Sequence, residues 1–175
     1  IAEAAYLALD QNGVLIFEDP YLGDMIEKTS YDQIYDEHVY IFSAISIKNI
    51  FEKYGFELIN LLPQSTHGGS MRYILAKKGS YKAEKIVDEF LLKEKKIGLD
   101  SPETYEKFRK NCEKSRDDLI KILEEEKKNN NRVVAYGATS KSTTILNYCK
   151  IGPELIEYIS DTTPIKQDKF SPGMH

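Results

Sequence analysis

Three side chains that could move or stabilise a proton lie within four residues of one another: Tyr35, Glu37 and His38. Imidazole is the natural proton acceptor near neutral pH. A nearby carboxylate can orient it or hold a substrate hydroxyl, and a phenol can donate to a developing oxyanion. The sequence therefore offers His38 as a general base with two assisting groups. The same residues also suit a surface loop whose tyrosines pack and whose Glu and His are solvated.

The elements around these residues predict how they are held. Residues 31–42 follow neither a helical nor a strand period, so we predict a loop, in which sequence neighbours can converge on one pocket. Residues 1–9 are rich in helix formers. The apolar run 14–17 is typical of a strand covered on both faces, as in a parallel sheet. It would end at the acidic residues 18–20, where open α/β sheets place ligand groups, and the loop would lie near that edge.

A second candidate lies between two predicted strands, residues 56–62 and 71–77. The paired glycines Gly68 and Gly69, beside Ser70, could bring backbone amides close to an anion, which Arg72 would then pair with. The alternative is a plain hairpin turn with an exposed arginine.

Helices are predicted on both sides of this hairpin. Ser46 can cap a short helix before it. The lysine-rich residues 93–96 are predicted to be the solvated end of a second helix. Ser101 and Pro102 are typical of a helix start, and this third helix would run to about Lys128.

A third candidate follows these helices. Residues 132–136 predict a buried strand, Gly137 a turn and residues 142–149 a helix, which together resemble the opening of a nucleotide-binding crossover. Only one glycine is present where the dinucleotide fingerprint has three. The next predicted strand, residues 156–160, ends at Asp161, which comes 24 residues after Gly137, close to the offset of about 20 at which such folds place an acid on a ribose.

Composition narrows the classes of function. The chain has 175 residues and a formal charge of −4 with acids and bases interspersed, which gives no electrostatic case for nucleic acid or an anionic membrane. No apolar run approaches the length of a membrane span, so we expect a cytoplasmic protein. Cys112 and Cys149 belong to no CxxC pair and are expected to be free buried thiols, so no metal site is expected.

Four segments, in one order over nearly the whole chain, resemble the sugar-nucleotide C-methyltransferases of deoxysugar biosynthesis, which methylate a ring carbon using S-adenosylmethionine. The segments are residues 31–43, 66–72, 136–141 with 146–148, and 161–166 running to 172–173.

The resemblance implies an α/β fold in three parts. Residues 1–78 would be the C-terminal portion of a class I methyltransferase Rossmann-like domain, 79–131 a helical connector, and 132–175 the beginning of a second Rossmann-like domain. The family's zinc-binding cysteines and its glycine-rich loop for S-adenosylmethionine are not found in this sequence. We therefore expect a fragment that is inactive alone, with zinc only in an N-terminal module outside it.

The resemblance also implies the chemistry. A keto group next to a ring carbon of a nucleotide-linked sugar acidifies the proton there, and its removal gives an enolate that attacks a methyl group. His38 would be the base, and Tyr35 and Glu37 would steady the enolate and position the sugar. The expected contacts to the sugar nucleotide, each of which also suits a structural role, are Gly68, Gly69, Ser70, Arg72, Gly137, Lys141, Asn147, Asp161 and Lys166.

Two alternatives stay open. The Gly137–Asp161 unit also suits a fragment of an NAD-dependent oxidoreductase, in which NAD would be the cofactor. The missing donor loop also suits a non-catalytic module that binds a nucleotide sugar.

Overall fold

The computed structural model describes residues 1–173, so the histidine at position 175 lies outside the described residues. It is a mixed α/β structure with two compact units. The first comprises Ile1–Ser30 with Tyr40–Lys107, and the second comprises Tyr31–Val39 with the residues from Phe108 onward. Each unit has its own hydrophobic core.

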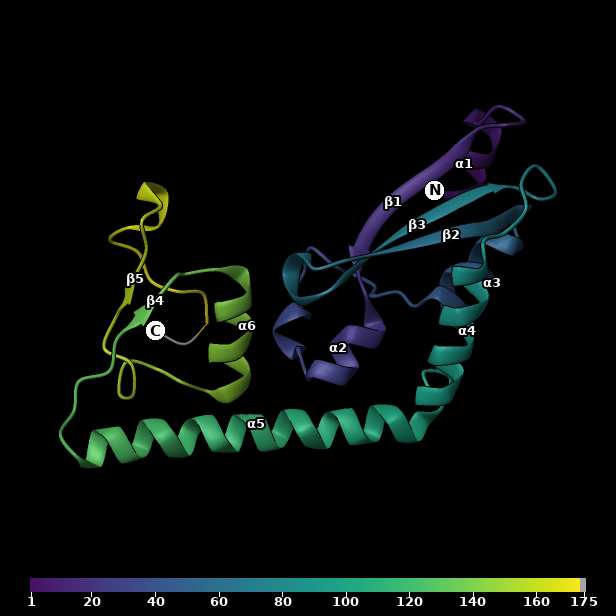
Figure 1. Ribbon diagram of the computed structural model, residues 1–175. Coiled ribbons are helices and arrows are strands. Elements are labelled where there is room, and N and C mark those ends of the chain that lie inside the picture. The colour runs from purple at the N-terminus through teal and green to yellow at the C-terminus, as the bar shows by residue number, and fades with distance from the viewer. Residues whose placement is uncertain (174–175) are drawn as a thin grey trace. The chain divides into compact units, whose positions relative to one another are not determined.

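A three-stranded antiparallel sheet forms the centre of the first unit (Figure 1). Its strands are β1 (Val14–Pro20), β2 (Phe56–Gln64) and β3 (Ser70–Lys77). β3 lies in the middle and is antiparallel to both neighbours. The predicted hairpin of β2 and β3 is confirmed, and its connection contains the 3₁₀ turn η2 (Thr66–Gly68).

The prediction that β1 is a doubly covered strand of a parallel sheet is wrong. β1 pairs only with β3 in the described sheet, and its side chains alternate between the two faces: Leu15 and Phe17 pack against the core, whereas Val14 and Ile16 are exposed. One covered face is typical of antiparallel sheets. β1 also continues to Pro20, so residues 18–20, at which the strand was predicted to end, lie within it.

Helices α1 (Ala2–Ala8), α2 (Leu22–Lys28), α3 (Ala44–Glu52) and α4 (Lys85–Ile97) complete the first unit. The buried core of this unit consists of Tyr21, Ala44, Ile47, Phe56, Leu58, Leu61, Met71, Tyr73, Leu75 and Val87.

The predicted cap of α3 needs correction. Ser43, not Ser46, is the capping residue, and its hydroxyl accepts a hydrogen bond from the Ser46 amide. The Ser46 hydroxyl accepts from the Ser43 amide in return. The two serines thus form a reciprocal capping box, because each satisfies a backbone donor that the helix leaves open.

A second correction concerns the lysine-rich end of α4, because Glu94 within it is fully buried. Its carboxylate accepts hydrogen bonds from the Ala44 amide (2.7 Å), the Ile45 amide (2.8 Å) and the Tyr21 hydroxyl (2.9 Å). It therefore binds the positive end of α3, where a negative charge is stabilised by the open N–H groups and the helix dipole.

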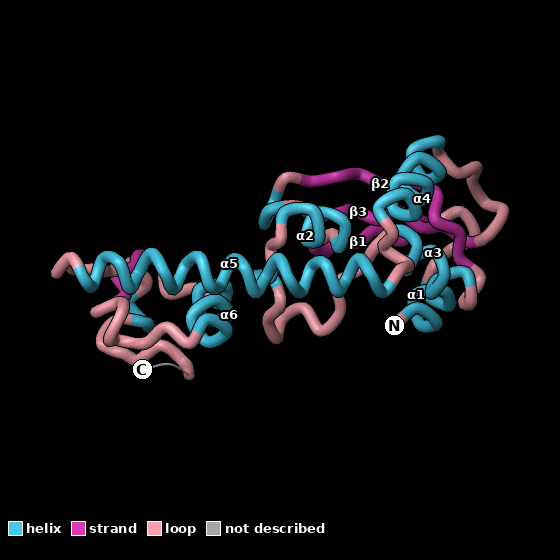
Figure 2. Tube along the Cα trace, turned by 90° about the horizontal axis from the view of Figure 1, so that it is seen from below, coloured by secondary structure: helices cyan, strands magenta, loops and turns pink. Residues whose placement is uncertain are grey.

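Helix α5 (Pro102–Lys128) begins at the predicted start signal and is continuous over 27 residues (Figure 2). Its first turns belong to the first unit and the rest to the second. Leu123 of α5 packs into the core of the second unit with Leu146, Cys149 and Ile151.

The second unit contains the predicted strand–turn–helix–strand crossover. β4 (Ala135–Tyr136) and β5 (Ile159–Ser160) are parallel, and α6 (Ser140–Cys149) connects them. Both strands are shorter than predicted, since only two residues of each are paired. The 3₁₀ turns η1 (Tyr31–Gln33) and η3 (Pro164–Lys166) also lie in this unit.

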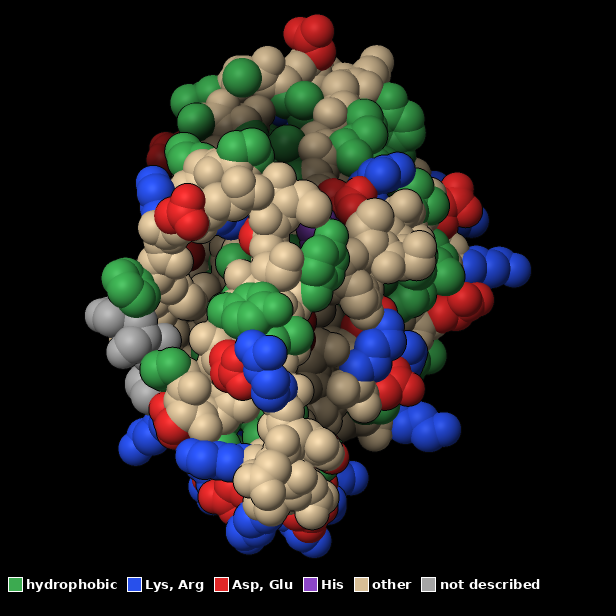
Figure 3. All heavy atoms as spheres, turned by 90° about the vertical axis from the view of Figure 1, so that its left-hand side faces the viewer, with side chains coloured by type: hydrophobic (Ala, Val, Ile, Leu, Met, Phe, Trp, Pro, Cys, Tyr) green, Lys and Arg blue, Asp and Glu red, His purple; other side chains and the backbone are tan. Residues whose placement is uncertain are grey.

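The surface of the second unit mixes apolar and charged side chains (Figure 3). Its exposed large apolar residues include Tyr136, Tyr158, Ile165 and Phe170. Over residues 1–173, no helix is both long enough and apolar enough to span a membrane.

Candidate active site

The loop of residues 31–42 contains only short turns, as predicted. The 3₁₀ turn η1 is followed by a tight turn in which the His38 amide donates to the Tyr35 carbonyl over 3.1 Å. At Phe42 the chain meets Tyr21 in an isolated bridge and then enters α3.

This tight turn places the side chains of Tyr35 and His38 side by side. Their ring centroids are 5.1 Å apart, with the ring planes at 78°, the edge-to-face arrangement that aromatic rings prefer. Both side chains are half-buried, whereas Glu37, at the third position of the turn, is exposed. The turn therefore presents an imidazole and a phenol together, with a carboxylate next to them in the chain.

Such a turn has the parts needed for proton abstraction from carbon. An imidazole can accept the proton, and a phenol hydroxyl can donate to the oxygen on which negative charge develops. Because both groups come from one turn, a single local structure sets their spacing.

Lys141, a predicted substrate contact, lies close to this loop. Its ammonium group is 3.8 Å from the carboxylate of Asp32 in η1. η1 packs against α6, which carries Lys141. The structure therefore brings Lys141 and the His38 loop into the same unit.

The second candidate, the β2–β3 connection, belongs to the first unit. Arg72 donates to Oε2 of Glu18 over 2.9 Å, and the Thr66 hydroxyl lies 3.0 Å from Oε1 of the same carboxylate. These two bonds hold the pKa of the Glu18 carboxyl below its usual range, and the bond from Arg72 has the larger effect. An anion bound here would share Arg72 with Glu18.

The glycines of this connection allow close packing against α2. A Cβ at Gly69 would lie 2.0 Å from the Asp24 carboxylate, and the φ angle of Gly69 is +139°, a conformation that essentially only glycine adopts. Lys28 donates to the Gly68 carbonyl. Ser70 is buried and its hydroxyl donates to the Thr66 carbonyl over 3.2 Å. In this structure the three residues close the turn.

The third candidate, the β4–α6 connection, is closed by Asp161. Its carboxylate accepts from the Thr163 amide and the Ala138 amide, each at 2.7 Å. Lys166 lies 3.5 Å from it and donates to the Ala138 carbonyl over 2.7 Å. The pKa of Asp161 is lowered to about 2. The hydrogen bonds from Thr163 contribute most, followed by the bond from the Ala138 amide and the charge of Lys166. Gly137 has a φ of +93°, which lets the chain turn between β4 and α6.

In the oxidoreductase alternative, the Asp161 carboxylate would bind a ribose hydroxyl. Each of its oxygens already accepts one backbone hydrogen bond, so a hydroxyl of NAD or of a nucleotide sugar would be an additional donor to it. Asn147, further along α6, donates to the carbonyls of Thr143 (2.8 Å) and Pro172 (2.9 Å) and so ties the helix to the later chain.

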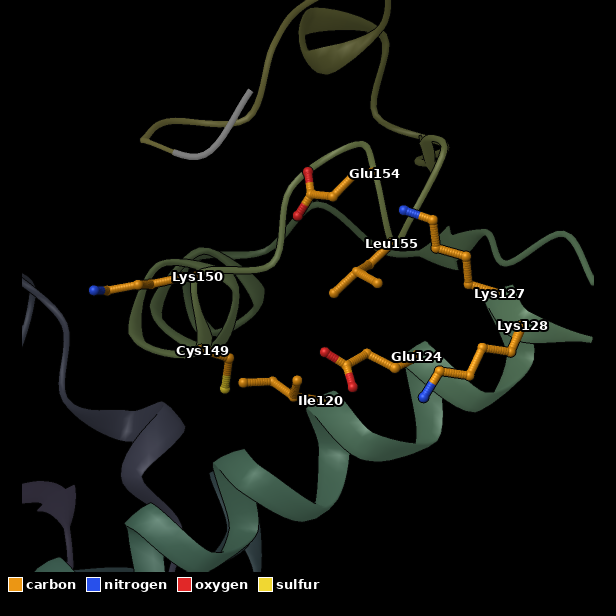
Figure 4. A pocket seen from close by; sticks show the side chains of 8 residues that line it. All are labelled: Ile120, Glu124, Lys127, Lys128, Cys149, Lys150, Glu154 and Leu155. Carbon is orange, nitrogen blue, oxygen red and sulfur yellow. The ribbon is translucent and has the colours of Figure 1, made fainter.

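A cavity of about 830 Å³ lies elsewhere in the second unit, between α5, the end of α6 and the segment that follows it (Figure 4). Three lysines and two glutamates line it around an apolar centre. The lining residues are Ile120, Glu124, Lys127, Lys128, Cys149, Lys150, Glu154 and Leu155. Because none of the predicted site residues lines this cavity, it adds nothing to the proton-transfer site.

Cys112 and Cys149 are free and buried, as predicted. Burial raises the pKa of both thiols, which makes them poor nucleophiles. Over residues 1–173, no three His, Cys, Asp or Glu side chains gather as a metal site would require.

The predicted site residues fall into two groups. The second unit contains Tyr35, Glu37 and His38 together with the predicted site residues of the β4–α6–β5 crossover. The first unit contains the predicted site residues between positions 68 and 72. The sequence analysis missed two residues that join the His38 loop to α6: Asp32 of the loop, which faces Lys141, and Thr144 of α6, whose hydroxyl donates to the Ile34 carbonyl. No local signal marks Thr144, because its partner lies 110 residues away in the sequence.

Comparison with known proteins identifies the protein family to which the chain belongs. The C-methyltransferase C-terminal domain family matches residues 65–175, and the chain belongs to this family. Among individual proteins, it is 30% identical over 171 residues to the C-methyltransferase NovU of Streptomyces niveus. That alignment covers 97% of this chain and 40% of NovU, so the chain spans less than half the length of this relative.

Proposed function

We propose that this chain is the part of a C-methyltransferase that removes a proton from the carbon to be methylated, and that His38 is the base. The substrate would be a nucleotide-linked keto-deoxysugar. The observation that carries this proposal is the turn that puts the Tyr35 phenol beside the His38 imidazole in a member of a C-methyltransferase family.

The proposed step moves one proton and one electron pair. The imidazole takes the proton from the carbon next to the ketone, and the C–H electron pair moves into an enolate. The Tyr35 hydroxyl donates to the enolate oxygen, and Glu37 holds a sugar hydroxyl or the protonated imidazole. Gly68, Gly69, Ser70, Arg72, Gly137, Lys141, Asn147, Asp161 and Lys166 remain the proposed contacts to the sugar nucleotide.

S-adenosylmethionine, the donor that the methyltransferase family implies, supplies an electrophilic methyl group when bound. The described residues do not fit it. Within residues 1–173, the single strand–glycine–helix crossover has one glycine, Gly137, in place of a glycine-rich loop, and Asp161 and Lys166 hold the Ala138 backbone there. We therefore assign the donor to no residue of this chain, and the chain's own part is removal of the proton.

The test is exchange of the substrate's carbon-bound proton with deuterium oxide, followed by mass spectrometry in the complete gene product without methyl donor. His38→Asn is expected to lower the exchange rate at least about 100-fold, the usual contribution of a general base. Asp36→Asn, an exposed change in the same turn, is the control and is expected to exchange at the wild-type rate. Undiminished exchange in His38→Asn would remove His38 from this role. Binding of the nucleotide sugar without exchange in the wild type would favour the non-catalytic module.

A further inference from the structure

The loop that carries His38 is held along its first four residues by contacts within the second unit. The Tyr31 ring packs against the Tyr148 ring, with centroids 5.1 Å apart, and the Tyr31 hydroxyl lies 3.8 Å from the Cys149 sulfur. Asp32 faces Lys141, and the side chain of Gln33 is buried. Burial raises the pKa of Tyr31 to about 12, so its hydroxyl keeps its proton at neutral pH.

The fourth contact is made by the backbone. The Thr144 hydroxyl lies 3.2 Å from the Ile34 carbonyl, to which it donates, and 3.3 Å from the Ser140 carbonyl one turn back in its own helix. Ile34 is the last residue before the Tyr35–His38 turn. Thr144 therefore fixes the point from which the proposed base and its phenol partner project.

The residues that make these contacts share one face of α6. Lys141, Thr144 and Tyr148 are separated by three and four positions, the spacing of side-chain neighbours on a helix. Leu146 and Cys149 of the same helix belong to the core of the second unit. A helix anchored in the core by two buried side chains thus supports a loop that contains only short turns.

We infer that α6 positions the catalytic loop, with Thr144 as the main positioning residue through its hydrogen bond to Ile34 and with Lys141 and Tyr148 assisting. This inference rests on the proposed function. Beyond that function, it gives α6 a second role: the helix holds the His38 turn in position, in addition to any contact that it makes with a nucleotide. Thr144 itself touches no reacting atom in this scheme.

The test compares three variants of the complete gene product. Thr144→Val removes the hydroxyl at constant shape, and Thr144→Ser restores it. Thr143→Val is the matched control, because the Thr143 hydroxyl donates within the helix to the Thr139 carbonyl. Hydrogen exchange of the backbone amides of residues 31–39 is followed by mass spectrometry, together with the KM and kcat for the nucleotide sugar.

Thr144→Val is expected to speed amide exchange in residues 31–39 about five-fold, the effect of losing one ordinary hydrogen bond. It is also expected to lower kcat with little change in KM. Thr144→Ser and Thr143→Val should match the wild type in both readouts. Wild-type amide exchange in Thr144→Val would overturn the inference. Should Thr144→Val fold poorly, Asp32→Asn tests the same support from the loop side, and unchanged loop exchange there counts against it.

The two proposals fail in different ways. Amide exchange needs no turnover, so it judges the support of the loop by itself. A wild-type protein that shows the expected contrast in amide exchange but never deuterates its substrate would overturn the proposed function alone.

Discussion

Glu94 shows how much one side chain can contribute to the first unit. Its carboxylate is withdrawn from water and accepts from two backbone amides at the start of α3 and from the Tyr21 hydroxyl. Burial, followed by the nearby charge of Glu94, raises the pKa of Tyr21, so the phenol remains a donor to it. A buried carboxylate with three donors replaces most of the hydration that it gives up.

We therefore expect Glu94→Gln to destabilise the chain by roughly 3 kcal/mol, because the amide NH₂ would face a backbone N–H and leave buried donors unsatisfied. Urea unfolding measures this difference. Glu89→Gln, an exposed change in the same helix, is the control and is expected to stay within about 0.5 kcal/mol of the wild type. Equal urea midpoints of unfolding for the two variants would mean that the Glu94 hydrogen bonds contribute little to stability.

The connection between β4 and α6 is an element whose stability depends on pH. The Asp161 carboxyl is only 11% exposed and has its pKa lowered from 3.8 to about 2. A carboxyl whose pKa is lower in the folded than in the unfolded state stabilises the fold fully above the unfolded value, and this contribution is lost as pH falls toward the folded value.

The expected outcome is that Asp161→Asn has a lower melting temperature than the wild type at pH 5, and that this gap narrows between about pH 4 and pH 2. Calorimetry across that range is the measurement. Asp168→Asn, which changes an exposed aspartate in the same segment, serves as the comparison. A gap that stays constant down to pH 2 would show that the ionised Asp161 does not support this connection.

At the scale of the whole molecule, each unit carries proposed contacts to a nucleotide sugar, and in each unit these include a cationic side chain that is already paired with an acid. Arg72 pairs with Glu18 in the first unit, and Lys141 with Asp32 in the second. A ligand that binds the folded chain raises its melting temperature by mass action. The ligand class can therefore be tested without catalysis.

A nucleotide sugar is expected to raise the melting temperature of the chain by a few degrees, since saturation at 100 times the Kd adds about 2.7 kcal/mol, whereas NAD should not. Arg72→Gln is expected to reduce the shift. Arg132→Gln breaks a comparable surface pair, with Glu157, and should keep it. A shift with NAD and none with the nucleotide sugar would contradict the proposed substrate class.

Local signals in the sequence were sufficient for several features. The start of α5 at Pro102, the hairpin of β2 and β3, and the crossover of β4, α6 and β5 were all predicted. Each depends on residues close together in the chain, through capping, turn formation or a change of hydrophobic period. The spacing of Tyr35 and His38 belongs here too, because one tight turn brings them together.

Contacts between residues distant in sequence could not be predicted in this way. The burial of Glu94 depends on the amides of α3, 50 and 49 residues before it, and the antiparallel setting of β1 depends on β3. Likewise, the residues around His38 resemble a solvated loop until α6 is placed against them. The sequence by itself determined which chemical groups this protein has and how near neighbours are spaced, because local backbone preferences set those. Tertiary structure alone decided which charges are buried and which helix supports the loop, since both follow from packing between segments far apart in the chain.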